Sequence, residues 1–309
     1  LGTQRRAEVV KLLEQAVREG KQICAVEALT QAPFESLTIT EQEEHTRAIL
    51  KIQEGCNNHC TYCIIPSVRG PIRSRPLAEI RTEAERLAAA GFTELVLTGI
   101  HLSSYGRDLQ DGTTLLDAIA QVQAAEGVRR IRLGSLEPTI ATPEFASALK
   151  QMDKVCPQFH LALQSGSDTV LARMARRYNS RMYLTGVENL RREFPEAAFT
   201  TDVLTGFPGE TEAEYEETRA MIERVRFAKI HVFPYSQRVG TKAAQMPGQL
   251  SNAEKERRAR ELIALGETIG RQYRERFFGR TVEVLLEEQD TAGEWVGYTR
   301  EYLRVEVHC

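Results

Sequence analysis

Three cysteines lie within eight residues of this chain, as Cys56, Cys60 and Cys63 in the segment Glu-Gly-Cys-Asn-Asn-His-Cys-Thr-Tyr-Cys. A [4Fe-4S] cluster binds four thiolates, so a loop with three cysteines can hold the cluster and leave one iron open to another ligand. Chemistry can take place at such an open iron. The spacing therefore predicts an iron–sulfur cluster with one reactive iron.

Other roles for these cysteines stay open. A structural zinc site needs a fourth ligand, and His59 is available, but His59 and Cys60 are adjacent and would strain to reach one tetrahedral ion together. A disulfide framework is disfavoured, because a chain of 309 residues can bury a core without cross-links. Chance clustering in one loop is the last alternative.

The composition, with 42% hydrophobic and 27% charged residues, is ordinary for a soluble globular protein. No run reaches the roughly 18 apolar residues of a membrane span, and the first residues lack the apolar core of a signal peptide. These features predict a location in the reducing cytoplasm, where cluster thiolates survive. The net charge of −3 gives no general attraction to nucleic acid, so an RNA contact must come from local patches.

Helical and strand-like segments alternate after the cysteine loop, a pattern typical of βα units and a parallel sheet. Right-handed crossovers through six such units predict an open barrel whose reactive edge lies at the C-terminal ends of the strands. The cysteine loop follows the first strand, at that edge. A helix is expected over 76–90, and the strands are expected at 47–53, 94–98, 129–134, 159–164, 198–204 and 228–233.

The two ends of the chain differ from this pattern. Residues 1–30 predict a helix and a short strand, and 251–278 predict one long amphipathic helix that Ser251 caps. Beyond Gly279 the period changes to two, which indicates a small antiparallel β module. The chain begins with Leu and ends with Cys in an apparent strand, so we expect it to be cut at both ends.

Polar or glycine-bearing turns follow nearly every expected strand, which is where a barrel keeps its functional groups. Each turn alone can be explained by turn and cap chemistry. Their convergence on the cysteine loop favours a site. The turns comprise residues 97–101, 134–138, 163–168, 202 with 206–211, and 234–241.

The stretch from 47 to about 280 resembles the radical S-adenosylmethionine (radical SAM) core of the methylthiotransferases. The segments that carry the resemblance are the cysteine loop, Leu-Thr-Gly-Ile-His-Leu-Ser-Ser-Tyr-Gly (97–106), Leu-Gln-Ser-Gly-Ser-Asp (163–168), Gly-Phe-Pro-Gly-Glu-Thr (206–211) and Tyr-Ser-Gln-Arg-Val-Gly-Thr (235–241). The resemblance implies an α/β fold, a partial (β/α)6 TIM-like barrel over 47–279. It also implies a remnant of the family's N-terminal domain with a linker over 1–46 and a partial, OB-like TRAM domain, an RNA-binding barrel, over 280–309.

Three branches of the family differ in substrate, and they act on isopentenyladenosine in tRNA, threonylcarbamoyladenosine in tRNA, or an aspartate of a ribosomal protein. The segments 97–106 and 231–236 are similar to the threonylcarbamoyladenosine branch, and Arg238 is less expected in the ribosomal-protein branch. The resemblance thus implies a transferase that methylthiolates C2 of N6-threonylcarbamoyladenosine at tRNA position 37. An RNA-binding module with a structural metal site is the alternative from another class.

By this resemblance, the open iron binds S-adenosylmethionine and delivers one electron, and the resulting 5′-deoxyadenosyl radical abstracts the hydrogen at C2. The implied partners are the tRNA anticodon loop and a one-electron donor such as flavodoxin or ferredoxin. A second [4Fe-4S] cluster, held by three cysteines of the N-terminal domain, supplies sulfur. This sequence departs from that pattern, because only Cys24 precedes the loop while Cys156 and Cys309 are scattered. We therefore expect the second cluster only with a domain that this sequence lacks.

The resemblance also implies individual roles. The cluster ligands are Cys56, Cys60 and Cys63, Tyr62 shapes the adenine pocket through its backbone, and Thr98-Gly99 occupies the place that binds the methionine amino group. Arg176 suits a carboxylate because a guanidinium forms two parallel charged hydrogen bonds; a surface ion pair is its alternative role. The remaining candidates are Ser135, Glu137 and Gln164 for carboxylate and ribose, Asp202 as a ligand or a polar anchor, and Arg69, Arg73 and Arg75 for anticodon-loop phosphates or as solvated side chains.

Overall fold

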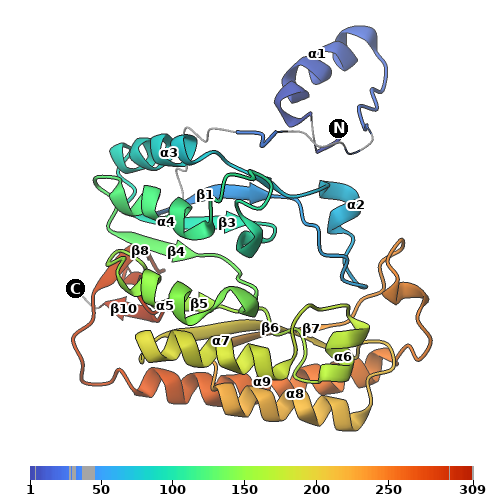
Figure 1. Cartoon of the computed structure of the whole chain (residues 1–309), viewed down its shortest axis with the longest axis vertical. Coiled ribbons are helices and arrows are strands. Elements are labelled where there is room, and N and C mark those ends of the chain that lie inside the picture. The colour runs from blue at the N-terminus through green and yellow to red at the C-terminus, as the bar shows by residue number, and fades with distance from the viewer. Residues whose placement is uncertain (4, 28, 30–32, 37–45, 292, 308–309) are drawn as a thin grey trace.

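The fold is an open half-barrel of six parallel strands with helices on its outer face (Figure 1). The computed structural model describes residues 1–3, 5–27, 29, 33–36, 46–291 and 293–307. Two ladders, β1-β3-β4 and β5-β6-β7, are joined by the parallel bridges Ile131–Val155 and Leu136–Leu161. The six strands are β1 (Arg47–Glu54), β3 (Glu94–Gly99), β4 (Arg130–Leu133), β5 (Gln158–His160), β6 (Ala198–Thr205) and β7 (Lys229–Pro234).

The predicted α/β half-barrel is therefore confirmed, with two differences in its strands. Strand β5 ends at His160, and residues 161–164 continue toward the reactive edge only through isolated bridges. A short strand that the sequence pattern did not indicate, β2 (Arg73–Ser74), pairs antiparallel with the end of β1. This pairing returns the chain along β1 directly after the cysteine loop.

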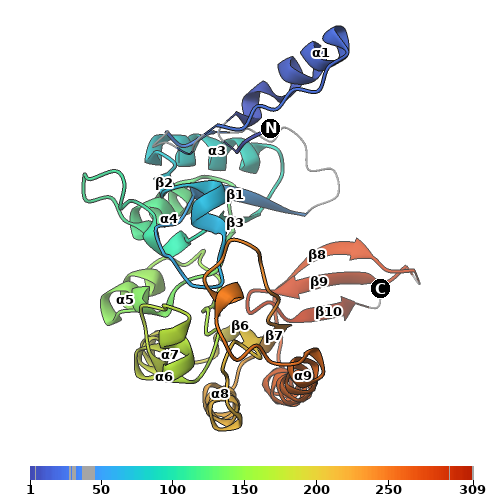
Figure 2. The ribbon, with the colours of Figure 1, turned by 90° about the vertical axis from the view of Figure 1, so that its right-hand side faces the viewer.

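Helices cover the outer face of the sheet because alternate strand residues point outward and are apolar. Leu50, Leu95, Leu97 and Ile131 are fully buried among helix side chains. Figure 2 shows the helices in an arc outside the sheet, with the last three strands on its open side. The helices are α3 (Leu77–Ala89), α4 (Leu115–Ala124), α5 (Pro143–Lys150), α7 (Ser180–Glu193), α8 (Glu212–Val225) and α9 (Asn252–Glu275), with the short α2 (Ile65–Arg69) and α6 (Asp168–Arg173) near the loop edge.

The long helix α9 packs unusually close to the edge strand β7. A Cβ atom at Gly266 would lie 2.4 Å from Cγ1 of Ile230, and one at Gly270 would lie 2.7 Å from the carbonyl oxygen of Ala228. These two glycines let the helix axis approach the strand. Ser251 caps the helix, as the sequence predicts, by accepting a hydrogen bond from the amide of Glu254.

Three antiparallel strands follow α9, as the period of two predicts: β8 (Val284–Gln289), β9 (Trp295–Thr299) and β10 (Arg304–Val307). This β module is anchored at the N-terminal ends of the barrel strands. Arg130, the first residue of β4, donates to the carbonyl oxygen of Tyr298 at 3.0 Å and pairs with Glu283 at 2.7 Å. The module therefore lies at the sheet edge opposite the cysteine loop.

The N-terminal segment contains the predicted helix, α1 (Val9–Glu19), which ends at Gly20 in the left-handed conformation. The short strand expected before residue 30 is wrong for residues 21–27, which form no regular structure, and part of the linker to β1 lies outside the described residues. Within the described ranges, no helix combines the length and the hydrophobicity that a membrane span requires.

Candidate active site

The cysteine loop leaves β1 through a turn that only glycine can adopt. Gly55 has φ = +72°, and a Cβ atom there would lie 1.9 Å from the carbonyl oxygen of Pro71. The amide of Cys56 then donates to the carbonyl oxygen of Gly70 at 3.1 Å, and Asn57 accepts from the amide of Ile72 at 3.1 Å. These bonds hold the start of the cysteine loop against the segment that leads into β2.

The other half of the loop is held by segments from the far side of the barrel. Thr61 donates from its amide to Met174 (3.0 Å) and from its hydroxyl to Arg173 (2.9 Å), both carbonyl oxygens at the end of α6. The carbonyl oxygen of Thr61 accepts from the amide of Ala243 at 2.8 Å. The loop thus lies at the C-terminal edge of the sheet, as the sequence predicts, and it connects the end of β1 with α6 and with the segment after β7.

The three thiols fit an iron–sulfur cluster better than a single metal ion. Cys60 is buried while Cys56 and Cys63 are half-buried, and burial raises the pKa of the Cys56 and Cys63 thiols, so a cation is needed to hold them as thiolates. In the part of the chain that the structure describes, no three His, Cys, Asp or Glu side chains are arranged around one ion, and His59 is exposed. Three soft sulfur donors on one compact loop suit a cluster, whose thiolates bind different irons.

Arg176 connects the cysteine loop to a buried carboxylate. Its Nη1 lies 3.3 Å from Sγ of Cys60, and its Nη2 lies 3.4 Å from Oε1 of Glu137. The guanidinium also lies 4.8 Å above the ring of Tyr178 and donates from Nε to the hydroxyl of Tyr178 at 3.2 Å. Only 10% of the Arg176 side chain is exposed, so the alternative of a surface ion pair is wrong.

A second group, which the sequence did not single out by role, reaches the same carboxylate. His101 Nε2 lies 3.4 Å from Oε2 of Glu137 and 3.2 Å from Nδ2 of Asn58 in the cysteine loop. Burial by itself raises the pKa of Glu137, but His101 and Arg176 outweigh this effect, so the pKa lies below its ordinary value. The feature of the sequence that pointed to His101 was its position in the turn after the second expected strand.

Thr98-Gly99 lies against the base of the loop, next to Gln53. The buried Gln53 accepts from the amide of His101 at 2.7 Å and donates to the carbonyl oxygens of Glu54 and Gly55, each at 2.8 Å. A Cβ atom at Gly99 would lie 2.8 Å from the Gln53 side chain. Gln53 therefore ties the second strand end to the loop, and its position allows no side chain at 99.

The aromatic ring next to the third cysteine packs inward. Tyr62 meets Phe207 edge-on at 6.4 Å, Phe207 meets Tyr235 at 5.5 Å, and burial raises the pKa of the Tyr62 phenol. These contacts hold the loop against the 206–211 and 235–241 segments. A role of the Tyr62 backbone in an adenine pocket stays a prediction.

The other predicted residues lie at the same edge with different partners. Ser135 is exposed, and Gln164 exchanges backbone hydrogen bonds with β6 at Asp202 and Leu204. Asp202 Oδ2 lies 3.4 Å from Nε2 of His160, on the inner face of the barrel, so Asp202 is at least a polar anchor. The roles of Ser135, Gln164 and Asp202 in binding a cofactor stay predictions.

The prediction of phosphate contacts is wrong for two of the three arginines after the loop. Arg73 and Arg75 are 3% and 6% exposed, so their guanidinium groups do not reach solvent RNA. Arg73 donates to the carbonyl oxygen of Arg69 at 3.0 Å. Arg69 itself lies 3.5 Å from the buried Glu54. These arginines brace the β1–β2 return because Glu54 and backbone oxygens there need cationic partners.

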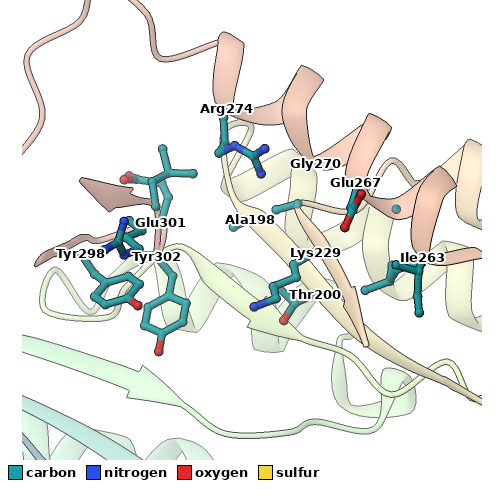
Figure 3. A pocket seen from close by; sticks show the side chains of 15 residues that line it. Ala198, Thr200, Lys229, Ile263, Glu267, Gly270, Arg274, Tyr298, Glu301 and Tyr302 are labelled. Atoms are coloured by element: carbon teal, nitrogen blue, oxygen red, sulfur yellow. The ribbon is translucent and has the colours of Figure 1, made fainter. Parts of the chain in front are cut away.

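A cavity of about 450 Å³ lies at the opposite end of the barrel, between β6, β7, α9 and the turn after β9. Figure 3 shows Lys229, Thr200 and Glu267 beside this cavity, with Tyr298 and Tyr302 from the β module at one end. The cavity includes none of the three cysteines. It is therefore separate from the cluster loop.

Comparison with known proteins assigns the chain to a family. The sequence profile of the Radical SAM superfamily matches residues 50–222. The chain is 40% identical, over 99% of its length, to the threonylcarbamoyladenosine tRNA methylthiotransferase MtaB of Bacillus subtilis, of which it covers 69%. It is 38% identical over its whole length to the tRNA-2-methylthio-N(6)-dimethylallyladenosine synthase of Caldicellulosiruptor saccharolyticus, of which it covers 65%. The chain spans about two thirds of the length of these relatives.

Solved structures of low sequence identity share the fold. The methyltransferase TsrM from Kitasatospora setae superposes with a TM-score of 0.54 at 18% identity, over 64% of this chain and 38% of that one. Coproporphyrinogen III oxidase (HemN) from Escherichia coli gives 0.52 at 14% identity, over 74% of this chain and 54% of that one. The profile match, the relatives and the three-cysteine loop agree: the chain belongs to the radical SAM superfamily, in the family of the tRNA methylthiotransferases.

Proposed function

We propose that this chain performs the radical SAM chemistry of a methylthiotransferase that acts on C2 of N6-threonylcarbamoyladenosine at tRNA position 37. The observation that carries the proposal is the loop of Cys56, Cys60 and Cys63 at the reactive edge, with Arg176 against Cys60. The relative at 40% identity acts on threonylcarbamoyladenosine, and the relative at 38% on dimethylallyladenosine. The segments 97–106 and 231–236 favour the first substrate over the second.

The three thiolates would hold a [4Fe-4S] cluster, which when bound supplies the electron that cleaves S-adenosylmethionine reductively. The chain's own residues fix the geometry of the site around the three cysteines. Arg176 puts a positive charge beside the sulfur of Cys60, which must stay a thiolate. Glu137 fixes the guanidinium from the other side, and His101 fixes Glu137. Gln53 holds the loop base, so the geometry is set before any ligand binds.

The inner face of the barrel is where substrate would approach. His231 and Phe233 of β7 are exposed there, next to the His160–Asp202 pair. Burial, together with Lys229, lowers the pKa of His231. The tRNA anticodon loop is the proposed partner, with a flavodoxin- or ferredoxin-like protein as electron donor and the cytoplasm as the location. The β module is proposed to be the start of a TRAM domain.

Sulfur insertion needs a second cluster, and the other described cysteines do not offer its ligands. Cys24 is exposed, whereas Cys156 is buried and its burial raises the pKa to about 11. A neutral buried thiol is an inert side chain. We therefore expect this chain to cleave S-adenosylmethionine without completing methylthiolation.

The test is anaerobic reconstitution with iron and sulfide, reduction, addition of S-adenosylmethionine, and measurement of 5′-deoxyadenosine and bound iron. About four irons per chain together with product would support the proposal. Zinc in place of iron, with no product, would indicate an RNA-binding module with a structural metal site. Methylthio-adenosine formed by this chain alone would refute the expectation of an incomplete reaction.

The substrate branch needs a separate measurement. Anticodon stem-loops that carry either threonylcarbamoyladenosine or isopentenyladenosine at position 37 should bind with different affinities. Tighter binding of the threonylcarbamoyl form is expected. Tighter binding of the isopentenyl form would indicate that the chain acts on isopentenyladenosine instead.

A further inference from the structure

A second hollow lies at the reactive edge, between the end of β7 and the first turn of α9. Its volume is about 440 Å³, and its walls are residues 234–237, Asn252, Lys255 and Glu256. Neither the cluster ligands nor Arg176 and Glu137 line it. It lies at the C-terminal end of β7, the same sheet edge from which the cysteine loop follows β1.

Lys255 brings a buried positive charge into this hollow. Only 7% of the residue is exposed, and its nitrogen lies 5.3 Å from the centre of the Tyr235 ring. Among the residues that the structure describes, Lys255 forms no ion pair, although Glu254 and Glu256 flank it on α9. Both glutamates are engaged by arginines of the same helix. A cation–π contact offsets only part of the cost of burying an ammonium group, so the site favours an anion.

Two further features bear on which ligand the hollow favours. The ring of Tyr235 lies under the ammonium of Lys255 on the wall of the hollow, while its hydroxyl is buried and has no hydrogen-bond partner within the described residues. Packing against Phe207 and a backbone bond to Thr205 (2.8 Å) hold this tyrosine in place. The hollow also contains the N-terminal turn of the 24-residue helix α9, whose dipole favours negative charge.

We propose that this hollow binds a phosphate group of the substrate RNA, through the ammonium of Lys255 and the N-terminal turn of α9. The inference rests on the proposed function, because it takes the anion to be a phosphodiester. The Glu256 carboxylate is 62% exposed at the rim, so it can turn to solvent when the phosphate enters. Edge-on ring contacts from Tyr62 to Phe207 and from Phe207 to Tyr235 set this site in fixed relation to the cysteine loop. A phosphate held here would position the target nucleotide at the cluster.

The experiment measures binding of a fluorescent tRNA anticodon stem-loop to the cluster-loaded chain over a series of salt concentrations. Lys255→Met keeps the aliphatic stem that packs on Gly206 but removes the ammonium over the Tyr235 ring. We expect it to weaken binding about fivefold and to lower the salt slope by about 0.7–0.9. Lys255→Arg should keep most of the slope.

Lys242→Met is the matched control, because Lys242 is an exposed lysine of the neighbouring segment outside the hollow. Unchanged affinity and slope in Lys255→Met, or an equal loss in Lys242→Met, would overturn the phosphate site while leaving RNA binding intact. Failure of the unmodified chain to bind RNA would overturn the proposed tRNA substrate, and with it this inference. Protection of Lys255 by inorganic phosphate but not by RNA, in a lysine-modification assay, would assign the hollow to free phosphate and refute the RNA role.

A second measurement keeps the test decisive if Lys255→Met does not fold. Neutral methylphosphonate groups are placed singly at the linkages around position 37, and binding to the unmodified chain is measured. One linkage should show a loss of about fivefold, with a lower salt slope. Equal affinity at every linkage would contradict the proposal.

Discussion

The guanidinium of Arg176 lies 3.3 Å from the sulfur of Cys60, although 116 residues separate them in the chain. The same side chain lies 3.4 Å from Glu137, so a thiol, a guanidinium and a carboxylate are in contact in succession. The guanidinium can donate a charged hydrogen bond to this sulfur, and the Glu137 carboxylate holds the guanidinium in position. The cysteine loop is thus only part of the site.

Replacing Arg176 by methionine should destabilise the fold and weaken cluster retention. The change leaves the Glu137 carboxylate buried without its guanidinium, which costs about 3–5 kcal/mol for a broken buried pair. Chemical denaturation and iron content after gel filtration measure the two effects. Arg181→Met, at an exposed arginine, is the control. If Glu137→Gln changes the stability by the same amount in the unmodified chain and in Arg176→Met, the two side chains are not coupled.

Replacing Gly99 by alanine should displace the base of the cysteine loop. The new Cβ would lie 2.8 Å from the Gln53 side chain, and overpacking of this kind costs about 1–3 kcal/mol. Displacement of Gln53 also breaks its hydrogen bond to the amide of His101. The loss in binding free energy for S-adenosylmethionine should therefore exceed the loss in the free energy of unfolding. Equilibrium dialysis gives the affinity. Ile100→Ala, at the exposed next residue, should leave it unchanged; an equal loss there would rule out the Gln53 contact as the cause.

Replacing Arg132 by methionine should loosen the β module. Glu94 is 1% exposed and pairs with Arg132 at 2.8 Å, while Arg132 also donates to the carbonyl oxygen of Arg300 at 3.1 Å. Loss of this buried cation should cost about 3–5 kcal/mol and speed hydrogen exchange in residues 284–307. The exposed Arg129→Met is the control. Unaltered exchange in the module would show that Arg132 does not anchor it.

The Arg173–Glu214 pair predicts a pH dependence of stability. Hydrogen bonds from Arg173 lower the pKa of Glu214 to about 2, from an ordinary value of about 4.5. Because the folded-state pKa is the lower one, the stabilisation is complete above pH 4.5 and is lost as the pH falls toward 2. Glu214→Gln should therefore lower the free energy of unfolding by about 1–2 kcal/mol at pH 7.

Urea denaturation from pH 7 to pH 3 measures this effect, with Glu216→Gln, on the exposed face of the same helix, as the control. The difference between Glu214→Gln and the unmodified chain should shrink steadily below pH 4.5. A difference that stays constant with pH would show that charge on Glu214 contributes nothing.

Local patterns in the sequence were enough to predict the half-barrel, because strand and helix are read from side-chain periods, caps and turn residues over a few positions. Five of the six predicted strand ranges agree with the structure to within two residues, and the three cysteines were found from their spacing alone. Strand β5 was predicted too long, since residues 161–163 are apolar like a strand but residues 161 and 164 make only isolated bridges, and Gln164 has φ = +63°.

Which polar groups meet was settled only by the tertiary structure. The prediction that Arg176 binds a carboxylate of the cofactor stays a prediction, and only the structure shows that Arg176 also contacts the carboxylate of Glu137. Arg73 and Arg75 share the residue type of phosphate-binding side chains, yet the β1–β2 return buries them. The reason is physical. Secondary structure depends on neighbours in sequence. The pairing of buried charges depends instead on which strand ends lie side by side in the curled sheet and on which side chains there are shielded from water.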